Sequence, residues 1–143
     1  MPVKVLFRLV RDEQGYPPAD IEGIWTNVDG SDVYTIDNIP FFANGIAIGD
    51  KIEAVKRDEE YWFVRKLESS GHATIRLIFF QLNQIDTIRE RLRTLGCSSE
   101  LSHLPMLVSV DIPPSVDYDA VVWELIELEE LEVCELEEAC MPP

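Results

Sequence analysis

The last part of the sequence lacks basic residues. No Lys or Arg follows Arg93, whereas residues 94–143 hold 12 Asp and Glu. Residues 1–93 contain all 12 basic residues and 15 acidic ones, so most of the net charge of −15 belongs to the C-terminal segment. A field of this sign repels nucleic acid and anionic membranes and attracts basic proteins. We therefore expect a basic protein partner, and neither nucleic acid nor a membrane surface.

Cysteines and long apolar runs are also scarce. Cys97, Cys134 and Cys140 are irregularly spaced and include no Cys-x-x-Cys pair, which favours free thiols over a disulfide framework or a zinc site. No apolar run reaches the roughly 18 residues of a membrane span. The first ten residues interrupt their apolar positions with charges, unlike a secretory signal. These features favour a cytoplasmic protein.

Motifs of known catalytic sites are missing as well. The sequence contains neither Gly-x-Ser-x-Gly nor a glycine-rich phosphate-binding loop. His72 and His103 stand alone, without the spacing of a metal site, and are interpreted as structural histidines. A joint acid/base or metal site of these two histidines, completed by Cys97 or an acid, is the alternative. We expect no catalytic residue, no metal and no cofactor, hence no enzyme.

The N-terminal half has the pattern of short antiparallel strands. Apolar and polar residues alternate from Val3 to Val10, which is the period of a strand. An Asp-Gly step at Val28–Ser31 predicts a hairpin, and Arg57–Glu60 predicts a second one. The expected strands are residues 3–10, 21–27, 32–37, 51–56 and 61–67. Five short strands in this space favour a small barrel-like subdomain over residues 1–69.

The C-terminal half changes to an alternation of strands and helices. The expected strands are residues 72–80, 97–103, 106–112 and 132–139, and the expected helices are residues 83–95 and 118–128. Gly96 is placed to stop the first helix. This order is βαββαβ, the ferredoxin-like unit, over residues 70–143. The predicted fold class is α+β, with a small antiparallel β-barrel-like sheet packed on a ferredoxin-like unit.

The segment Asp37–Asp50, "DNIPFFANGIAIGD", links the two halves. Its adjacent phenylalanines, Phe41 and Phe42, point to opposite sides if the chain is extended there. We interpret the segment as apolar core at the junction. The alternative is a pocket between the subdomains, lined by Phe41, Phe42, His72 and His103.

The acidic C-terminal segment surrounds a few apolar residues. Charge runs of this kind are usually solvated faces, but a solvated face normally mixes both signs. Aromatic and aliphatic residues in an acidic field are typical of a docking surface for a basic protein. The predicted partner-binding residues are Trp123, Glu127, Glu130, Glu135 and Glu137.

Several stretches together resemble a known family. They are "VKVLFRL" at residues 3–9, the segment 37–50, "SSGHATIRLIFF" at residues 69–80 and "RERLRTLGCSSELSHLPMLVSVDIPPSVDY" at residues 89–118. The chain resembles, over roughly residues 3–120, a bacterial family catalogued as a domain of unknown function, family 4265. The resemblance implies a small bacterial protein and brings no activity and no catalytic residues. The acidic segment after Tyr118 lies beyond this resemblance.

Two functional hypotheses follow. The first is a bacterial immunity protein that binds a cognate toxin domain and occludes its basic active-site cleft, because toxins that act on nucleic acid need cationic clefts. The second is a small-molecule-binding regulatory module that uses the pocket at the junction.

Overall fold

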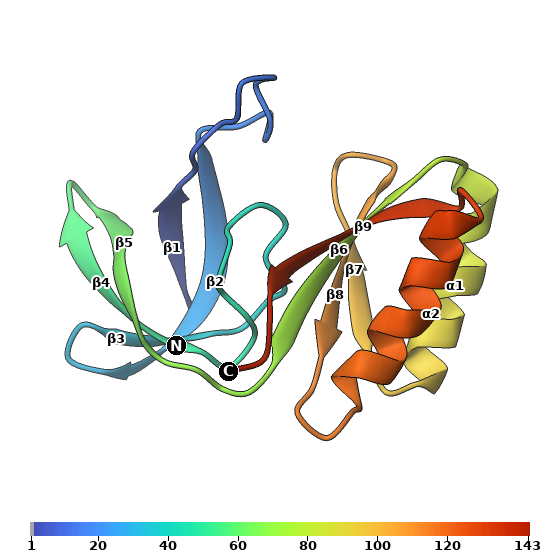
Figure 1. Ribbon diagram of the computed structural model, residues 1–143. Helices are drawn as coiled ribbons and strands as arrows, with labels where there is room; N and C mark the ends of the chain where they lie inside the picture. Colours follow the sequence, from blue (N-terminus) through green and yellow to red (C-terminus); the bar gives the residue numbers. More distant parts are fainter. Residues whose placement is uncertain (1) are drawn as a thin grey trace.

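The structure is a computed structural model that describes residues 2–143. It places a group of five strands beside a four-stranded sheet that carries two helices (Figure 1). The strands are β1 (Pro2–Arg8), β2 (Ile21–Gly30), β3 (Val33–Ile36), β4 (Lys51–Arg57), β5 (Glu60–Glu68), β6 (Ala73–Phe79), β7 (Ser98–Leu101), β8 (Leu107–Ile112) and β9 (Cys134–Cys140). The helices are the 3₁₀ turn η1 (Leu82–Gln84), α1 (Ile85–Thr94) and α2 (Tyr118–Glu130).

Strands β1 to β5 close into a barrel. Each strand pairs antiparallel with the next one, and β1 closes the ring through a parallel pairing with β5. The predicted barrel was expected to be antiparallel throughout, so this closing pair is a difference. Apolar residues at alternate positions fill the interior, among them Val5, Ile24 and Ile52, which are fully buried. Closure removes the free edges that a small open sheet would expose.

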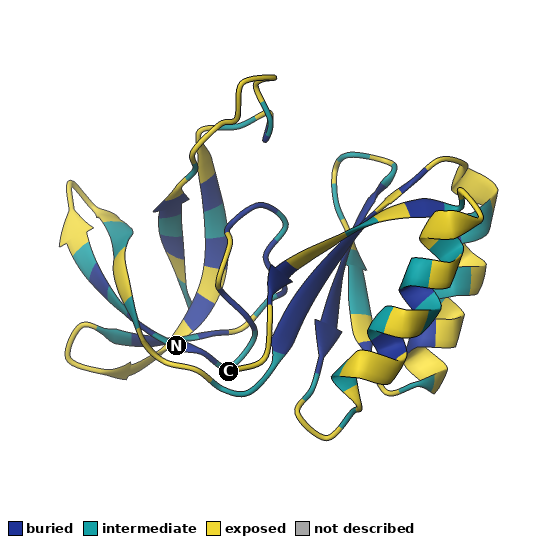
Figure 2. Cartoon of the chain, in the orientation of Figure 1, coloured by how far each residue is buried: buried dark blue, intermediate teal, exposed yellow. Residues whose placement is uncertain are grey.

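The second sheet has the order β7-β8-β6-β9, with every neighbouring pair antiparallel. One of its faces is covered by α1 and α2, and the other is turned toward the barrel (Figure 1). Ile75, Val110 and Leu125 belong to the core between this sheet and the helices. The inner faces of the helices are buried and their outer faces are exposed (Figure 2). The α+β class with mostly antiparallel sheets is therefore confirmed.

Element ends differ from the prediction by a few residues, for local reasons. β2 runs on to Gly30 because a bulge between Val28 and Gly30 absorbs the Asp-Gly step, so the tight turn lies at Ser31 and Asp32. β7 ends early because the Ser102 hydroxyl bonds both the N–H and the carbonyl of Leu104, which turns the chain.

The ends of the helices follow capping rules. Asp117 accepts a hydrogen bond from the Ala120 N–H at 3.2 Å and so caps the start of α2. Gly96 follows the end of α1 with a positive φ of 98°, and its N–H donates to Arg93 O, which confirms it as the predicted stop.

The segment 37–50 joins the barrel to the second sheet. On the barrel side, the Glu22 carboxylate accepts hydrogen bonds from three successive backbone N–H groups, those of Phe41, Phe42 and Ala43, at 2.6–3.0 Å. On the sheet side, Gly45 N–H donates to Ala139 O of β9, and the Thr74 hydroxyl of β6 donates to Ile46 O. The segment is thus the junction that the sequence predicts.

Candidate functional site

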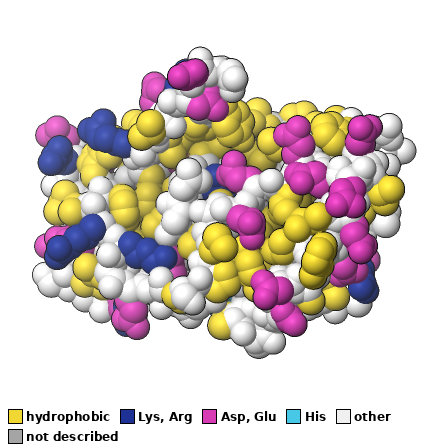
Figure 3. All heavy atoms as spheres, in the orientation of Figure 1, with side chains coloured by type: hydrophobic (Ala, Val, Ile, Leu, Met, Phe, Trp, Pro, Cys, Tyr) yellow, Lys and Arg dark blue, Asp and Glu magenta, His cyan; other side chains and the backbone are white. Residues whose placement is uncertain are grey.

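The outer face of α2 carries three of the predicted partner-binding residues. Val121 and Leu125 are buried against the sheet, so the helical period turns Trp123, Glu127 and Glu130 to the opposite side. The Trp123 side chain is 65% exposed. Acidic side chains gather over the part of the molecule that holds α2 and β9, whereas Lys and Arg lie mainly over the barrel (Figure 3).

The acids of this region fall into two groups. Some have structural partners: Glu124 pairs with Arg91 of α1 at 2.8 Å, Glu129 accepts from the Leu136 N–H, and Glu138 accepts from the Tyr118 hydroxyl. Glu127 and Glu130 form neither a hydrogen bond nor an ion pair with a side chain among residues 2–143. Their carboxylates are therefore available to an outside partner.

The remaining two predicted partner residues lie elsewhere. Cys134 and Leu136 of β9 face the helices, so Glu135 and Glu137 alternate to the opposite face of the sheet. Glu137 pairs with the buried Arg76 at 2.8 Å. The five residues consequently divide into a face on α2 and a separate pair on β9.

The barrel and the second sheet enclose a hollow of about 370 Å³ at the junction. Phe42 lines it, together with Tyr16 from the loop after β1 and Arg76 from β6. Arg76 is 3% exposed, and burial lowers the pKa of its guanidinium while Glu137 opposes that shift. Burial, and then the Glu137 charge, raise the pKa of the Tyr16 hydroxyl. The hollow therefore combines aromatic walls with a buried cation.

The four residues predicted for a junction pocket are not brought together. Phe42 lines the hollow, and His103 packs edgewise on its ring, with centroids 6.5 Å apart. Phe41 is half-buried and lies outside the lining. His72 precedes β6 and His103 precedes β8, and because these strands are antiparallel the two histidines lie at opposite ends of the pair.

His72 instead forms a pair with a buried carboxylate. Its Nδ1 lies 2.9 Å from Oδ1 of Asp111, which β8 places beside the start of β6. Burial raises the pKa of Asp111, and the His72 contact opposes that shift. His72 is therefore hydrogen-bonded, as the sequence predicts, whereas the His103 side chain forms no hydrogen bond with another protein group among residues 2–143.

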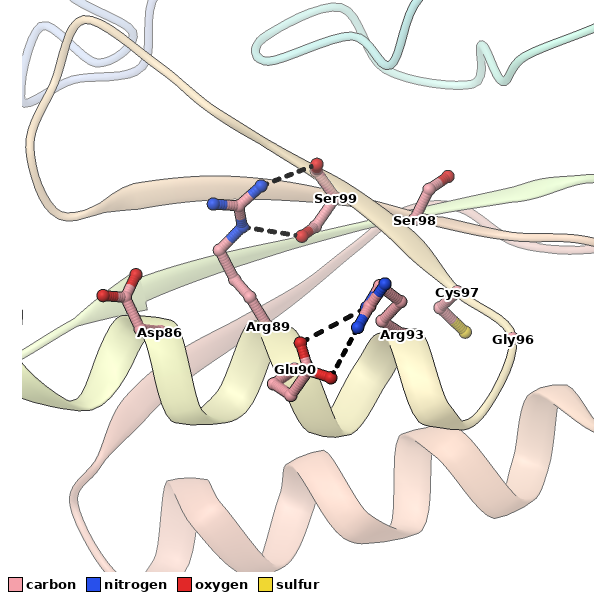
Figure 4. A pocket seen from close by; sticks show the side chains of 8 residues that line it. All are labelled: Asp86, Arg89, Glu90, Arg93, Gly96, Cys97, Ser98 and Ser99. Carbon is pink, nitrogen blue, oxygen red and sulfur yellow. Dashed lines mark hydrogen bonds and ion pairs between the residues drawn. The ribbon is translucent and has the colours of Figure 1, made fainter.

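A wider groove of about 590 Å³ runs between α1 and the edge strand β7 (Figure 4). Its cations are already engaged: Arg89 donates to the hydroxyl and carbonyl of Ser99, and Arg93 pairs with Glu90. Cys97 lies at its end, and burial raises the pKa of this thiol to about 11. Burial thus disfavours the thiolate of Cys97, which is the nucleophilic form of a cysteine.

Sequence reasoning missed Glu22, Arg76 and Tyr16. Arg76 had a usable signal, because a single charge interrupts the apolar run from Ala73 to Phe79. Glu22 and Tyr16 had none, since an acid near a strand end and a tyrosine in a loop are ordinary. Within residues 2–143, no group of three or more His, Cys, Asp or Glu is arranged to hold a metal. No helix in the described part of the chain has both the length and the apolar character to cross a membrane.

Comparison with known proteins gives a family and a structural relative. No curated protein matches the chain. A crystal structure of a hypothetical protein from Neisseria gonorrhoeae is similar, with a TM-score of 0.82 at 20% identity, and the match covers 100% of this chain and 97% of that one. This likeness shows a shared fold.

The sequence profile described as domain of unknown function (DUF4265) matches residues 22–136. This match begins later than the resemblance seen in the sequence. It also extends further, through α2 and into β9, so most of the acidic segment is part of the family domain. The chain belongs to the DUF4265 family.

Proposed function

We propose that this chain is a non-enzymatic acidic binding protein, a bacterial immunity protein that neutralises a cognate toxin domain by occluding its basic active-site cleft in the cytoplasm. The observation that carries the proposal is the outer face of α2. There an exposed Trp123 stands beside Glu127 and Glu130, whose carboxylates have no partner among the described residues. Tryptophan is among the residue types enriched in the energetic hot spots of protein interfaces.

The charge of this face supports a basic partner. Residues 94–143 carry 12 acids and no base, so a long-range field guides a cationic surface toward α2. The same acids are unfavourable for the helix itself. Glu127 and Glu130 lie in its last turn, where the helix dipole favours cations, and that turn contains no basic residue. Because these acids weaken the helix, their presence supports a role in partner binding and not in the stability of the fold.

The architecture supports the availability of α2. We infer that the second part of the chain has the ferredoxin-like arrangement expected from the sequence, on the strand order β7-β8-β6-β9 and on two helices that share one face. In this arrangement the barrel and α2 lie on opposite sides of the sheet. A partner on α2 therefore does not collide with the barrel.

The proposal is tested by capture of the partner from the native bacterium, followed by mass spectrometry and by repetition at high salt. Wild-type protein is compared with Glu127→Lys/Glu130→Lys, which reverses two charges on α2. The matched control is Glu13→Lys/Glu60→Lys, which makes the same charge change at two exposed sites outside α2.

We expect one basic chain in stoichiometric amount with the wild type and the control. The α2 variant should not capture this basic chain. Salt should slow association of the basic chain with the wild type, because exposed charges are screened over roughly 10 Å at 0.1 M salt. Trp123→Ala should weaken the complex by about 2 kcal/mol or more. Equal capture by both double variants would refute the assignment of this face.

A further inference from the structure

The hollow at the junction has the composition of a ligand site. Its volume of about 370 Å³ lies in the range of small-molecule sites, roughly 300–1,000 Å³. Its lining comes from five separate parts of the chain: β1 with the loop that follows it, β5, the segment 37–50, β6 and β9. Hydrophobic side chains cover much of the surface between the barrel and the second sheet (Figure 3).

The apolar walls are aromatic. Phe7 and Phe63 stack with centroids 4.4 Å apart and an interplanar angle of 18°, and both line the hollow. Tyr16 meets Phe42 edge to face with centroids 6.1 Å apart, and these two also line it. A flat or branched apolar group can pack against the exposed surfaces of such rings.

The polar side of the hollow holds a buried guanidinium that is incompletely paired. Arg76 Nη1 donates to Phe42 O, Asn44 Oδ1 and Glu137 Oε1, and Nη2 donates to Ala43 O. The Nε atom has no hydrogen-bond partner among residues 2–143. An arginine has five N–H donors, so the Nε–H and one N–H of Nη2 remain without an acceptor. Nε–H together with an N–H of Nη2 is one of the edges by which an arginine binds a carboxylate as a fork.

The charges around Arg76 favour a ligand that carries one positive and one negative charge and is neutral overall. Glu137 pairs with Arg76 and the buried Glu22 acts on it through space, so two acids already surround this cation. The lining itself holds Arg8 and Arg76 against Asp12 and Glu137, so a simple anion would add an unbalanced negative charge. A zwitterion brings a carboxylate to Arg76, places its ammonium near Glu137 and leaves the net charge unchanged. Glu137 is half exposed, and its Oε2 has no partner within the described residues.

We propose that the junction hollow binds a free α-amino acid with an aromatic or branched apolar side chain. The carboxylate pairs with the unpaired donors of Arg76, the ammonium faces Glu137, and the side chain lies against Phe42 and the Phe7–Phe63 pair. This inference is independent of partner binding at α2, because none of these residues lies on that helix.

Calorimetric titration with L-phenylalanine tests the proposal against three analogues. Phenylalaninamide lacks the carboxylate, 3-phenylpropionate lacks the ammonium, and L-alanine lacks the ring. We expect saturable binding of L-phenylalanine and at least about tenfold weaker binding of each analogue, because each leaves a charged or apolar group of the site without its partner.

Glu137→Gln and Glu135→Gln give a matched pair on β9, since Glu135 lies on the same face and does not line the hollow. Glu137→Gln should weaken the binding of L-phenylalanine about tenfold and strengthen the binding of 3-phenylpropionate, because the substitution removes one negative charge from the site. Glu135→Gln should change neither of these two affinities. No saturable binding of L-phenylalanine up to about 10 mM would overturn the proposal. Equal effects of the two variants, or equal binding of phenylalaninamide, would also overturn it.

Discussion

Among single residues, two buried carboxylates hold the junction segment. Glu22 accepts from the N–H groups of Phe41, Phe42 and Ala43. Asp50 accepts from the N–H groups of Ala47 and Ser70 at 2.8 and 2.9 Å and pairs with Lys66 at 3.0 Å. A segment without strands or helices thereby has partners for backbone groups that burial would otherwise leave unpaired.

Loss of the Glu22 charge should destabilise the fold. Glu22→Gln keeps the size of the side chain but leaves one acceptor oxygen for three N–H groups. Because hydrogen bonds to charged groups contribute about 1.5–3 kcal/mol, we expect the free energy of unfolding to fall by about 2–3 kcal/mol. Urea denaturation measures the change. Glu60→Gln, at an exposed position, is the control and should be nearly neutral, and equal losses in both variants would contradict the anchoring role.

Asp111 should make stability depend on pH. Burial raises its pKa above the ordinary 3.8, so the folded protein holds this proton more tightly than the unfolded chain. The contribution of Asp111 to the free energy of unfolding is complete below pH 3.8. It is lost as pH rises through the pKa of Asp111 in the folded protein. We therefore expect the unfolding free energy to decline with pH in that window, relative to that of Asp111→Asn.

Urea denaturation at a series of pH values, with both proteins carrying His72→Gln, removes the neighbour that opposes the shift of Asp111. The difference between the two proteins should change steadily across the window. A constant difference, or one of the opposite sign, would show that the folded state does not raise the pKa of Asp111.

At the scale of elements, α2 combines a structural face with a face that the fold does not need. Glu127 and Glu130 meet the negative end of the helix dipole. Replacement of each by Lys should raise the free energy of unfolding by about 0.3–1 kcal/mol while it weakens partner binding. Thermal and urea unfolding of the single variants test this. If both variants were destabilised instead, these acids would have a structural role and the outer face of α2 would lose its main support.

Element order was predictable from local pattern, and exact element ends were not. The alternation of Val3, Val5 and Phe7 and the helical spacing on either side of Val121 and Leu125 are local signals, and they led to the correct sequence of strands and helices. The β2 bulge and the short β7 depend on how neighbouring strands and turns pair, which a single segment does not encode.

At the scale of the whole molecule, the junction separates what sequence can predict from what it cannot. A link rich in apolar residues predicted that segment 37–50 lies between two halves. The partners of that segment come from β2, β6 and β9, far away in sequence, so the roles of Glu22 and Arg76 emerge only in three dimensions. The five predicted partner-binding residues are divided for the same reason, namely that their places depend on the three-dimensional fold. β9 and α2 turn their exposed sides in opposite directions.

The charge distribution is the property of the whole molecule on which the proposed function depends. The barrel carries most of the cations, whereas acidic side chains gather over the region of α2 and β9 (Figure 3), and residues 94–143 contain 12 acids and no base. In the proposed complex, this asymmetry would turn α2 toward the cationic cleft. The barrel then lies away from the interface.

The most direct test of neutralisation is bacterial growth during co-expression with the captured basic chain. Expressed alone, that chain should arrest growth. Wild-type protein and Glu13→Lys/Glu60→Lys should restore growth, whereas Glu127→Lys/Glu130→Lys should fail although it folds. A captured chain that does not impair growth, or full rescue by the α2 variant, would contradict the account.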